Sequence, residues 1–164
     1  MQTETAAPPP ATHPFRDAFM ARDFDAMREA LNPGVVLNSP ILTTPFEGRE
    51  AVMELFEVIR DTLEDIQYTV DMADGDVRFM SWRTQIGNVK MEGAEIMRLD
   101  GEGRIVEFTV FFRPLAGITV LAQALGKGLA GRRSPARGRL AGVASAPMVA
   151  LSRVADRVAP RLVK

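Results

Sequence analysis

The sequence predicts an α+β fold, in which N-terminal helices cover one face of an antiparallel sheet. Apolar residues recur at a spacing of three and four positions over residues 13–63, which is typical of amphipathic helices. Over residues 66–112 they alternate with polar residues or form β-branched runs, as strands do. The turn segments "ADGD", "GN" and "DGEG" divide this second part into four strands. Helices that precede an antiparallel meander gather on one of its faces, which gives the α+β class.

The helical part is predicted to contain three helices and one short strand. Residues 1–12 are rich in Ala, Pro and Thr and are expected to be disordered, because they offer little to bury. Pro14 suits the first turn of a helix, and Phe15 and Phe19 lie one turn apart on its face. The other elements expected here are a helix capped by Asp23, a strand over residues 35–39 after the "NPG" stop at 32–34, and a helix over residues 49–63.

The predicted strands place one carboxylate among apolar side chains. These strands are expected at residues 66–72, 77–86, 89–99 and 104–112. Successive side chains of a strand point to opposite faces, so Met91, Gly93, Glu95 and Met97 share one face. Among apolar neighbours, desolvation should raise the pKa of Glu95. The alternative is a carboxyl group tied to a neighbour such as Arg83, to backbone N–H groups or to water.

The composition excludes several classes of site. The chain has no Cys, so it forms no disulfide and no thiolate metal site or nucleophile. His13 is the only His and is expected to lie exposed at a helix start, so neither a zinc cluster nor a Ser-His-Asp triad is predicted. No metal and no cofactor are expected. The N-terminus lacks the features of a secretory signal, and no apolar run approaches the ~18 residues of a membrane span, so a cytoplasmic protein is predicted.

The charge of the chain is divided unevenly along its length. Residues 1–114 carry 11 Lys and Arg against 20 Asp and Glu, whereas residues 115–164 carry 9 Lys and Arg against one acid, Asp156. Residues 115–164 are therefore predicted to be a basic amphipathic helical extension. Its expected parts are a helix over 115–130 with the stripe Leu115, Ile118, Ala122, Leu125 and Leu129, a linker over 131–139, and a helix over 140–159 with a kink or late start near Pro147.

Three interpretations of this extension remain open. Its helices can pack on the acidic body of their own chain or of a dimer partner. Residues 132–164 can instead lie on an anionic membrane surface, because apolar residues and a ridge of Arg153, Arg157 and Arg161 share one helix. Nucleic acid is not favoured, since the extension has no aromatic residue for stacking and no reading motif.

The order of motifs over about residues 13–114 resembles one known superfamily. The motifs are "ARDFDAM", "VVLNSP", "PFEGREAV" and "GAEIMRLDGEGRIVEFTVFFRP". In this order they resemble the SnoaL-like branch of the nuclear transport factor 2-like superfamily. The resemblance implies a curved antiparallel sheet that the helices wrap into a cone with an internal apolar pocket. It also implies homodimers that form through the outer face of the sheet.

The same resemblance implies an incomplete catalytic set. Ser39 stands where ketosteroid isomerases carry a carboxylate base, and Phe15 stands where they carry an oxyanion-binding Tyr. Glu95 matches their protonated carboxylic acid, whereas Val110 stands where the cyclases of the family carry an Asp. A hydroxyl group cannot take a proton from carbon near neutral pH without a base beside it. Only one catalytic group of the isomerases is therefore retained.

The sequence thus favours a small-molecule-binding protein with an apolar pocket for a lipid-like or polycyclic ligand. One alternative is a polyketide cyclase or isomerase type of enzyme that uses Glu95 as its acid and base. The other alternative is a dimeric adaptor that docks a membrane or a partner through its basic extension. The residues predicted to contact the ligand are Phe15, Phe19, Leu37, Ser39, Trp82, Met91, Glu95, Met97, Phe108 and Val110.

Overall fold

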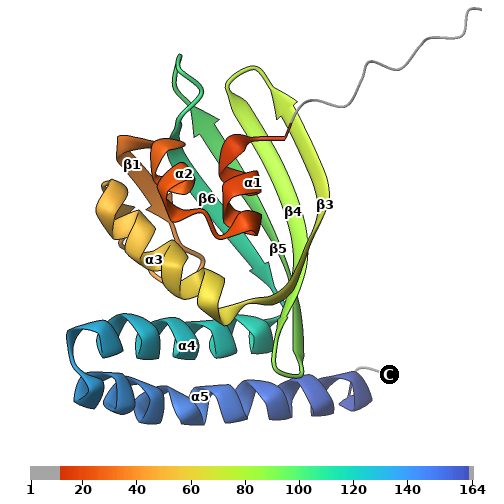
Figure 1. Ribbon diagram of the computed structural model, residues 1–164. Coiled ribbons are helices and arrows are strands. Elements are labelled where there is room, and N and C mark those ends of the chain that lie inside the picture. Colours follow the sequence, from red (N-terminus) through yellow and green to blue (C-terminus); the bar gives the residue numbers. More distant parts are fainter. Residues whose placement is uncertain (1–11, 163–164) are drawn as a thin grey trace, which may run out of the picture.

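The computed structural model describes residues 12–162, apart from the side chains of residues 157, 159, 160 and 162. It confirms the α+β class, because helices cover one face of a curved sheet and a helical hairpin follows (Figure 1). The disorder predicted for residues 1–12 lies outside the described residues, except at Thr12. In order, the elements are α1 (Pro14–Ala21), α2 (Phe24–Glu29), β1 (Leu31–Asn38), β2 (Phe46–Glu47), α3 (Arg49–Thr62), β3 (Glu64–Asp74), β4 (Val77–Ile86), β5 (Val89–Leu99), β6 (Ile105–Arg113), α4 (Leu115–Arg133) and α5 (Pro135–Leu162).

The sheet contains six strands in the order β2-β1-β6-β5-β4-β3. Strands β3 to β6 form the predicted antiparallel meander. Strand β1 lies parallel to β6, however, so the sheet is mixed rather than wholly antiparallel. The alternation of apolar residues is the same in parallel and antiparallel strands, so it does not encode the direction of pairing. Strand β1 also begins earlier than expected, at Leu31, and its register shifts before Val36, where Pro33 has no N–H to give to the ladder.

Three phenylalanines join the helices to the concave face of the sheet. Phe15 of α1, Phe56 of α3 and Phe108 of β6 are buried, and their ring centroids lie 4.9–5.3 Å apart. The tilted and edge-to-face angles of these pairs are the arrangements that aromatic rings prefer. This cluster fixes α1 and α3 over the sheet, as Figure 1 shows for the two helices.

The outer face of the sheet carries apolar side chains that remain exposed. Val70 and Met72 of β3, Ile96 of β5 and Phe111 of β6 are all more than a third exposed. Met72 and Ile96 both pair with Phe79 of β4, so they belong to one row across three strands. A homodimer through this face stays a prediction.

The C-terminal extension folds as a hairpin, and its boundaries differ from the predicted ones. Ser134 alone separates α4 from α5, so no linker spans residues 131–139. Pro135 opens α5, since a first-turn residue needs no N–H donor, and the helix continues through Pro147. Pro147 lies on an exposed part of α5, where water can satisfy the carbonyl that lacks its helical partner. A Cβ on Gly138 would lie 2.9 Å from the Cα of Gly131, so this glycine allows the two helices to approach closely.

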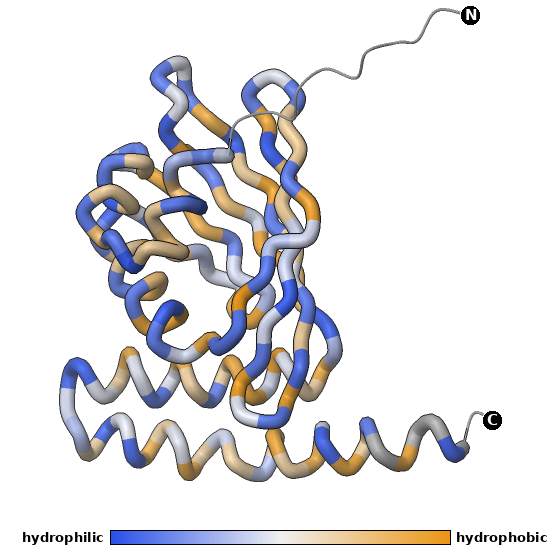
Figure 2. Tube along the Cα trace, turned by 45° about the vertical axis from the view of Figure 1, so that its right-hand side comes forward, coloured by the Kyte–Doolittle hydropathy of each residue, from blue (hydrophilic) through white to orange (hydrophobic). Residues whose placement is uncertain are grey.

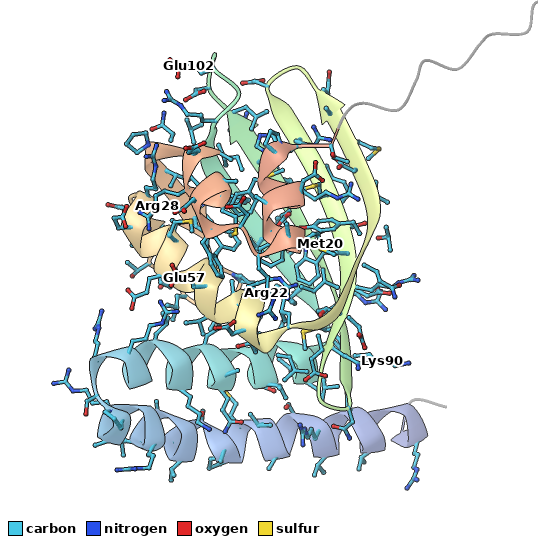
Figure 3. The ribbon with its side chains drawn as sticks, in the orientation of Figure 1. Met20, Arg22, Arg28, Glu57, Lys90 and Glu102 are labelled. Carbon is cyan, nitrogen blue, oxygen red and sulfur yellow. The ribbon has the colours of Figure 1, made fainter. Side chains whose placement is uncertain are left out.

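Helix α4 lies between the body and α5 (Figures 1 and 3). Arg132 of α4 forms an ion pair of 2.8 Å with Glu57, which Figure 3 labels on α3. On the side of α5, the hydroxyl groups of Thr119 and Ser152 lie 2.6 Å apart. Because α4 is covered from two sides, its buried residues do not follow the single predicted stripe, and Leu115 of that stripe is 61% exposed.

No helix among the described residues is both long enough and apolar enough to cross a membrane.

His13 is buried, contrary to the expected exposed position. It is the N-cap of α1, and its Nδ1 accepts a hydrogen bond of 3.2 Å from the Phe15 backbone N–H. That role leaves the proton on Nε2, which lies 3.0 Å from the Gly103 carbonyl oxygen and donates to it. The turn between β5 and β6 therefore covers His13, and burial lowers the pKa of its imidazole. The bond from the Phe15 N–H needs the neutral ring, because a protonated Nδ1 cannot accept it.

We predict that His13→Ala lowers the free energy of unfolding by about 1–2 kcal/mol, because it removes the N-cap of α1 and the bond to Gly103. Urea denaturation measures this loss. His13→Asn keeps a side-chain acceptor at the N-cap and should recover part of the stability. Equal stability of His13→Ala and the unsubstituted chain would contradict the role of this residue.

Candidate functional site

A small apolar cavity lies between the concave face of the sheet, the helices and α4. Its volume is about 50 Å³. Of the residues predicted to contact a ligand, seven line it and three do not. The lining residues are Phe15, Phe19, Leu37, Ser39, Trp82, Glu95 and Val110. Met91, Met97 and Phe108 are buried in the core beside it and are absent from its wall.

Glu95 is the acidic residue of this cavity wall, and strand β5 directs it inward. The burial of β5 alternates as predicted, with Met91, Gly93, Glu95 and Met97 on the buried face. Glu95 is 6% exposed, and its Oε1 has no hydrogen-bond partner among the described residues. Burial raises the pKa of Glu95 to about 7, while a hydrogen bond from the Trp82 side chain opposes the shift and the negative charge of Asp71 adds to it. The carboxyl group can therefore hold or release a proton near neutral pH.

Trp82 depends on Gly93 for its position beside Glu95. The two residues are directly opposed on β4 and β5. A Cβ on Gly93 would overlap the indole ring, so only glycine leaves room for Trp82 at this place. On its other side the indole meets Phe112 edge-on, at 4.6 Å between ring centroids. The ring is thus held between two strands with its N–H available to Glu95.

Tyr68 lines the cavity although the sequence did not point to it. Burial raises the pKa of its phenol well above the usual value, and the nearby charge of Glu95 adds to the effect. The guanidinium of Arg16 lies 4.6 Å from the centre of its ring. Arg16 also contacts Asp71 at 2.7 Å, and Asp71 contacts Arg78 at 2.6 Å. Arg16 and Arg78 thus pair with Asp71, and no described cation forms an ion pair with Glu95.

Arg83 is not the partner of Glu95 that the sequence left open. It lies on the outer face of β4 and pairs with Glu92 at 3.0 Å. The hydroxyl group of Ser39 stabilises the local turn, because its Oγ accepts a hydrogen bond of 3.1 Å from the Ile41 N–H. No side chain that could act as a strong base therefore joins Glu95 in the described cavity wall, where Tyr68 is the other titratable group.

A second hollow of about 120 Å³ adjoins the cavity, between α4 and the segment that joins β1 to β2. Leu42 lines it from that segment, Phe46 from β2, and Gly126 and Leu129 from α4. The two hollows share the side chains of Ser39, Ile41, Leu55 and Leu125, which form the partition between them. The sequence placed Leu125 on an apolar stripe but gave no signal that this stripe would close the cavity.

The described residues contain no group of three or more His, Cys, Asp or Glu side chains that could hold a metal ion.

Comparison with known families identifies the body of the chain. The model of the SnoaL-like domain matches residues 13–108, more than half of the sequence. The chain belongs to the SnoaL-like domain family. The resemblance found in the sequence is thereby confirmed. No curated protein matches the chain.

Solved structures agree with this SnoaL-like fold. A steroid delta-isomerase from Pseudomonas aeruginosa is similar at 30% identity and a TM-score of 0.63, covering 73% of this chain and 85% of that one. A protein with a cystatin-like fold from Silicibacter pomeroyi is similar at 20% identity and a TM-score of 0.64, over 76% of this chain and 89% of that one. An NTF2-like protein from Mesorhizobium loti is similar at 23% identity and a TM-score of 0.55, over 61% and 85%. The last two likenesses show the fold alone.

We predict that the ionisation of Glu95 lowers stability as the pH rises. Its pKa is 4.5 in an exposed setting and about 7 in the fold, so between these values the folded chain binds more protons than the unfolded chain. The free energy of unfolding must then decrease with rising pH through this window, by about 3 kcal/mol in total.

Glu95→Gln cannot ionise and should lack this decrease. Urea unfolding of both proteins from about pH 4 to about pH 8 measures it, and the difference between the two profiles cancels other titrating groups such as His13. Parallel profiles would show that Glu95 does not titrate between these values in the folded chain.

Proposed function

We propose that this SnoaL-like protein binds an apolar small molecule in the cavity, with Glu95 as the donor of a hydrogen bond to the ligand. The observation that supports the proposal is the unpartnered Oε1 of Glu95, buried in a wall of apolar and aromatic side chains. A buried carboxyl oxygen without a partner destabilises the fold, and a ligand oxygen would supply that partner.

The protonation state of Glu95 determines which ligand atom it can bind. With a pKa of about 7, the carboxyl group is largely protonated in mildly acidic solution and carries one O–H donor. A carbonyl or hydroxyl oxygen is the matching acceptor. The Trp82 indole is directed at the same carboxyl group and holds it in place. The ligand we propose is therefore apolar, with a single oxygen-bearing group that enters first.

The volumes favour a lipid-like ligand over a polycyclic one. Sites for small molecules usually measure about 300–1,000 Å³, whereas this cavity holds about 50 Å³. Binding must therefore move the partition and join the cavity to the hollow of about 120 Å³ beside it. Rotation of Ile41 and Leu125 would open a narrow path between the two spaces. A flexible acyl chain can follow such a path, whereas a rigid ring system needs a wider one.

We predict that Leu125→Phe weakens binding about tenfold, because a larger side chain at the partition narrows this path. The probe is the methyl ester of a fluorescent polyene fatty acid, followed by fluorescence titration, with a 3-ketosteroid as competitor. Leu115→Phe is the matched control, since Leu115 lies on the same helix but is 61% exposed. Glu95→Met, which removes the donor, should weaken binding about fivefold.

Other outcomes would count against the proposal. Equal affinities of Leu125→Phe and Leu115→Phe would mean that the probe does not pass the partition. Tight binding of the ketosteroid without binding of the ester would identify a polycyclic ligand. If neither compound binds, the chain is not a carrier of such molecules.

An enzyme that uses Glu95 as its acid and base is the second candidate. The 30% identity with a steroid delta-isomerase favours it, and a pKa of about 7 suits a group that both takes and gives a proton. The position of the isomerase base is occupied by Ser39, which is committed to the Ile41 N–H, and the position of the oxyanion-binding Tyr is occupied by Phe15. Proton transfer and oxyanion binding would both fall to Glu95 and its neighbours.

We predict no isomerisation of a β,γ-unsaturated ketosteroid above the uncatalysed rate, because Ser39 and Phe15 provide neither a base nor a hydrogen-bond donor to the oxyanion. The absorbance of the conjugated product measures the rate. A rate that exceeds the background and disappears in Glu95→Gln would establish the enzyme and displace the carrier proposal. The same loss in Ser39→Ala would show that the hydroxyl takes part.

A further inference from the structure

Helix α5 presents an apolar face to solvent along most of its length. We name this set the α5 stripe. Its members range from 42% to 72% exposed, although all are Leu, Val or Met. They are Leu140, Val143, Met148, Leu151, Val154 and Val158. At 100° per residue these positions fall on one side of the helix. The sequence predicted apolar residues along this helix and left open whether they pack on the body, on a dimer partner or on a membrane, and the described residues of this chain leave them uncovered.

The opposite side of α5 is the one that packs against α4. Gly138, Val149 and Ser152 are buried there, and Ser152 shares a hydrogen bond with Thr119 of α4. Helix α4 separates α5 from the body (Figures 1 and 2). Since the stripe is exposed and lies opposite the side of α5 that contacts α4, it faces away from the rest of the described chain. The stability of the hairpin therefore does not require the stripe to be covered by this chain.

The arginines of α5 whose side chains are described differ from those of the body, because they have no partner among the described residues. In the body, cations such as Arg16, Arg28 and Arg104 contact carboxylates. The four arginines of α5 with described side chains are exposed, and none forms a hydrogen bond or an ion pair with another described residue. They are Arg137, Arg139, Arg153 and Arg161. The acidic body, which the sequence offered as one surface for this extension, thus forms no ion pair with these four arginines.

We propose that α5 lies on the surface of an anionic lipid bilayer, with the α5 stripe inserted among the acyl chains and its arginines at the phosphate groups. Short apolar side chains flanked by arginine suit the boundary between headgroups and acyl chains. The positive charge of the extension favours anionic lipid over a second copy of the chain. Residues 115–164 carry 9 Lys and Arg against one acid, so a second copy on the same face would bring like charges together. Anionic lipid neutralises them instead.

This proposal is independent of what the cavity binds. It rests on α5 alone, and its test contains no cavity ligand. If the carrier function also holds, the docked orientation places α4, with Leu121 and Leu125 of the cavity wall, between the bilayer and the cavity.

The test is flotation of the full chain with two kinds of vesicle, one of phosphatidylcholine alone and one of phosphatidylcholine with phosphatidylglycerol. We expect binding to the anionic vesicles only, and weaker binding at high salt. Val143→Glu combined with Leu151→Glu should reduce binding at least about tenfold, because both side chains belong to the inserted stripe. Arg139→Gln combined with Arg153→Gln should reduce it by about tenfold or more.

Matched controls separate the stripe from exposed residues in general. Val70→Glu combined with Met72→Glu places the same charges on exposed apolar residues of the outer sheet face, and should leave binding within about twofold. Circular dichroism should show unchanged folding of the α5 variants, since the substituted side chains are exposed.

Three results would overturn the proposal. The first is no binding to anionic vesicles, and the second is equal binding by the stripe variant and the unsubstituted chain. The third is a dimer in light scattering that becomes a monomer in Val143→Glu with Leu151→Glu, which would assign the stripe to a second copy.

Discussion

The contact among Phe15, Phe56 and Phe108 is the interaction on which the rest of the body depends. Each ring comes from a different element, α1, α3 or β6, so the cluster ties two helices to the concave face of the sheet. Each ring buries about 150–250 Å², and each pair adds about 1 kcal/mol beyond burial. Without this cluster, α1 and α3 would have no fixed distance from the sheet. The cavity is the space that remains beside it, with Phe15 and Phe56 in its wall.

Glu95 lies in that space, and the fold does not compensate for the desolvation of its carboxyl group. No described cation forms an ion pair with its carboxyl group, and the guanidinium groups of Arg16 and Arg78 contact Asp71. A hydrogen bond from Trp82 supports Glu95 among the described residues, and the position of Trp82 in turn requires the absent side chain of Gly93. A fold selected for stability alone would place an apolar residue here. Sites that break this rule without local compensation are where function is expected.

Helix α4 links the two proposed roles of the chain. One side of it contributes Leu121 and Leu125 to the cavity wall, and another side receives α5 through Thr119. The helix is therefore both the cover of the cone and the support of the outer helix. Because the same rigid element touches the cavity and the surface-facing helix, the two places cannot be displaced wholly independently. The extension is thus part of the architecture of the site.

Periodicity along the chain was sufficient to predict the elements and the parity of the strands. The apolar spacing predicted α1, α3 and the four strands of the meander, and alternation along β5 placed Glu95 on the buried face. These features depend on neighbours within a few residues, so the local sequence encodes them. The stripe of α5 was visible for the same reason, since the 100° turn of a helix is a local property.

The tertiary structure alone decided which partners meet across long separations. Sequence reasoning did not foresee the parallel pairing of β1 with β6, the burial of His13 under Gly103 or the place of Tyr68 in the cavity wall. It also left open what covers the α5 stripe, because a periodic apolar face shows that a surface can be buried but not by what. Each of these outcomes is set by the distance between segments that are far apart in the chain, and no periodic pattern records that distance.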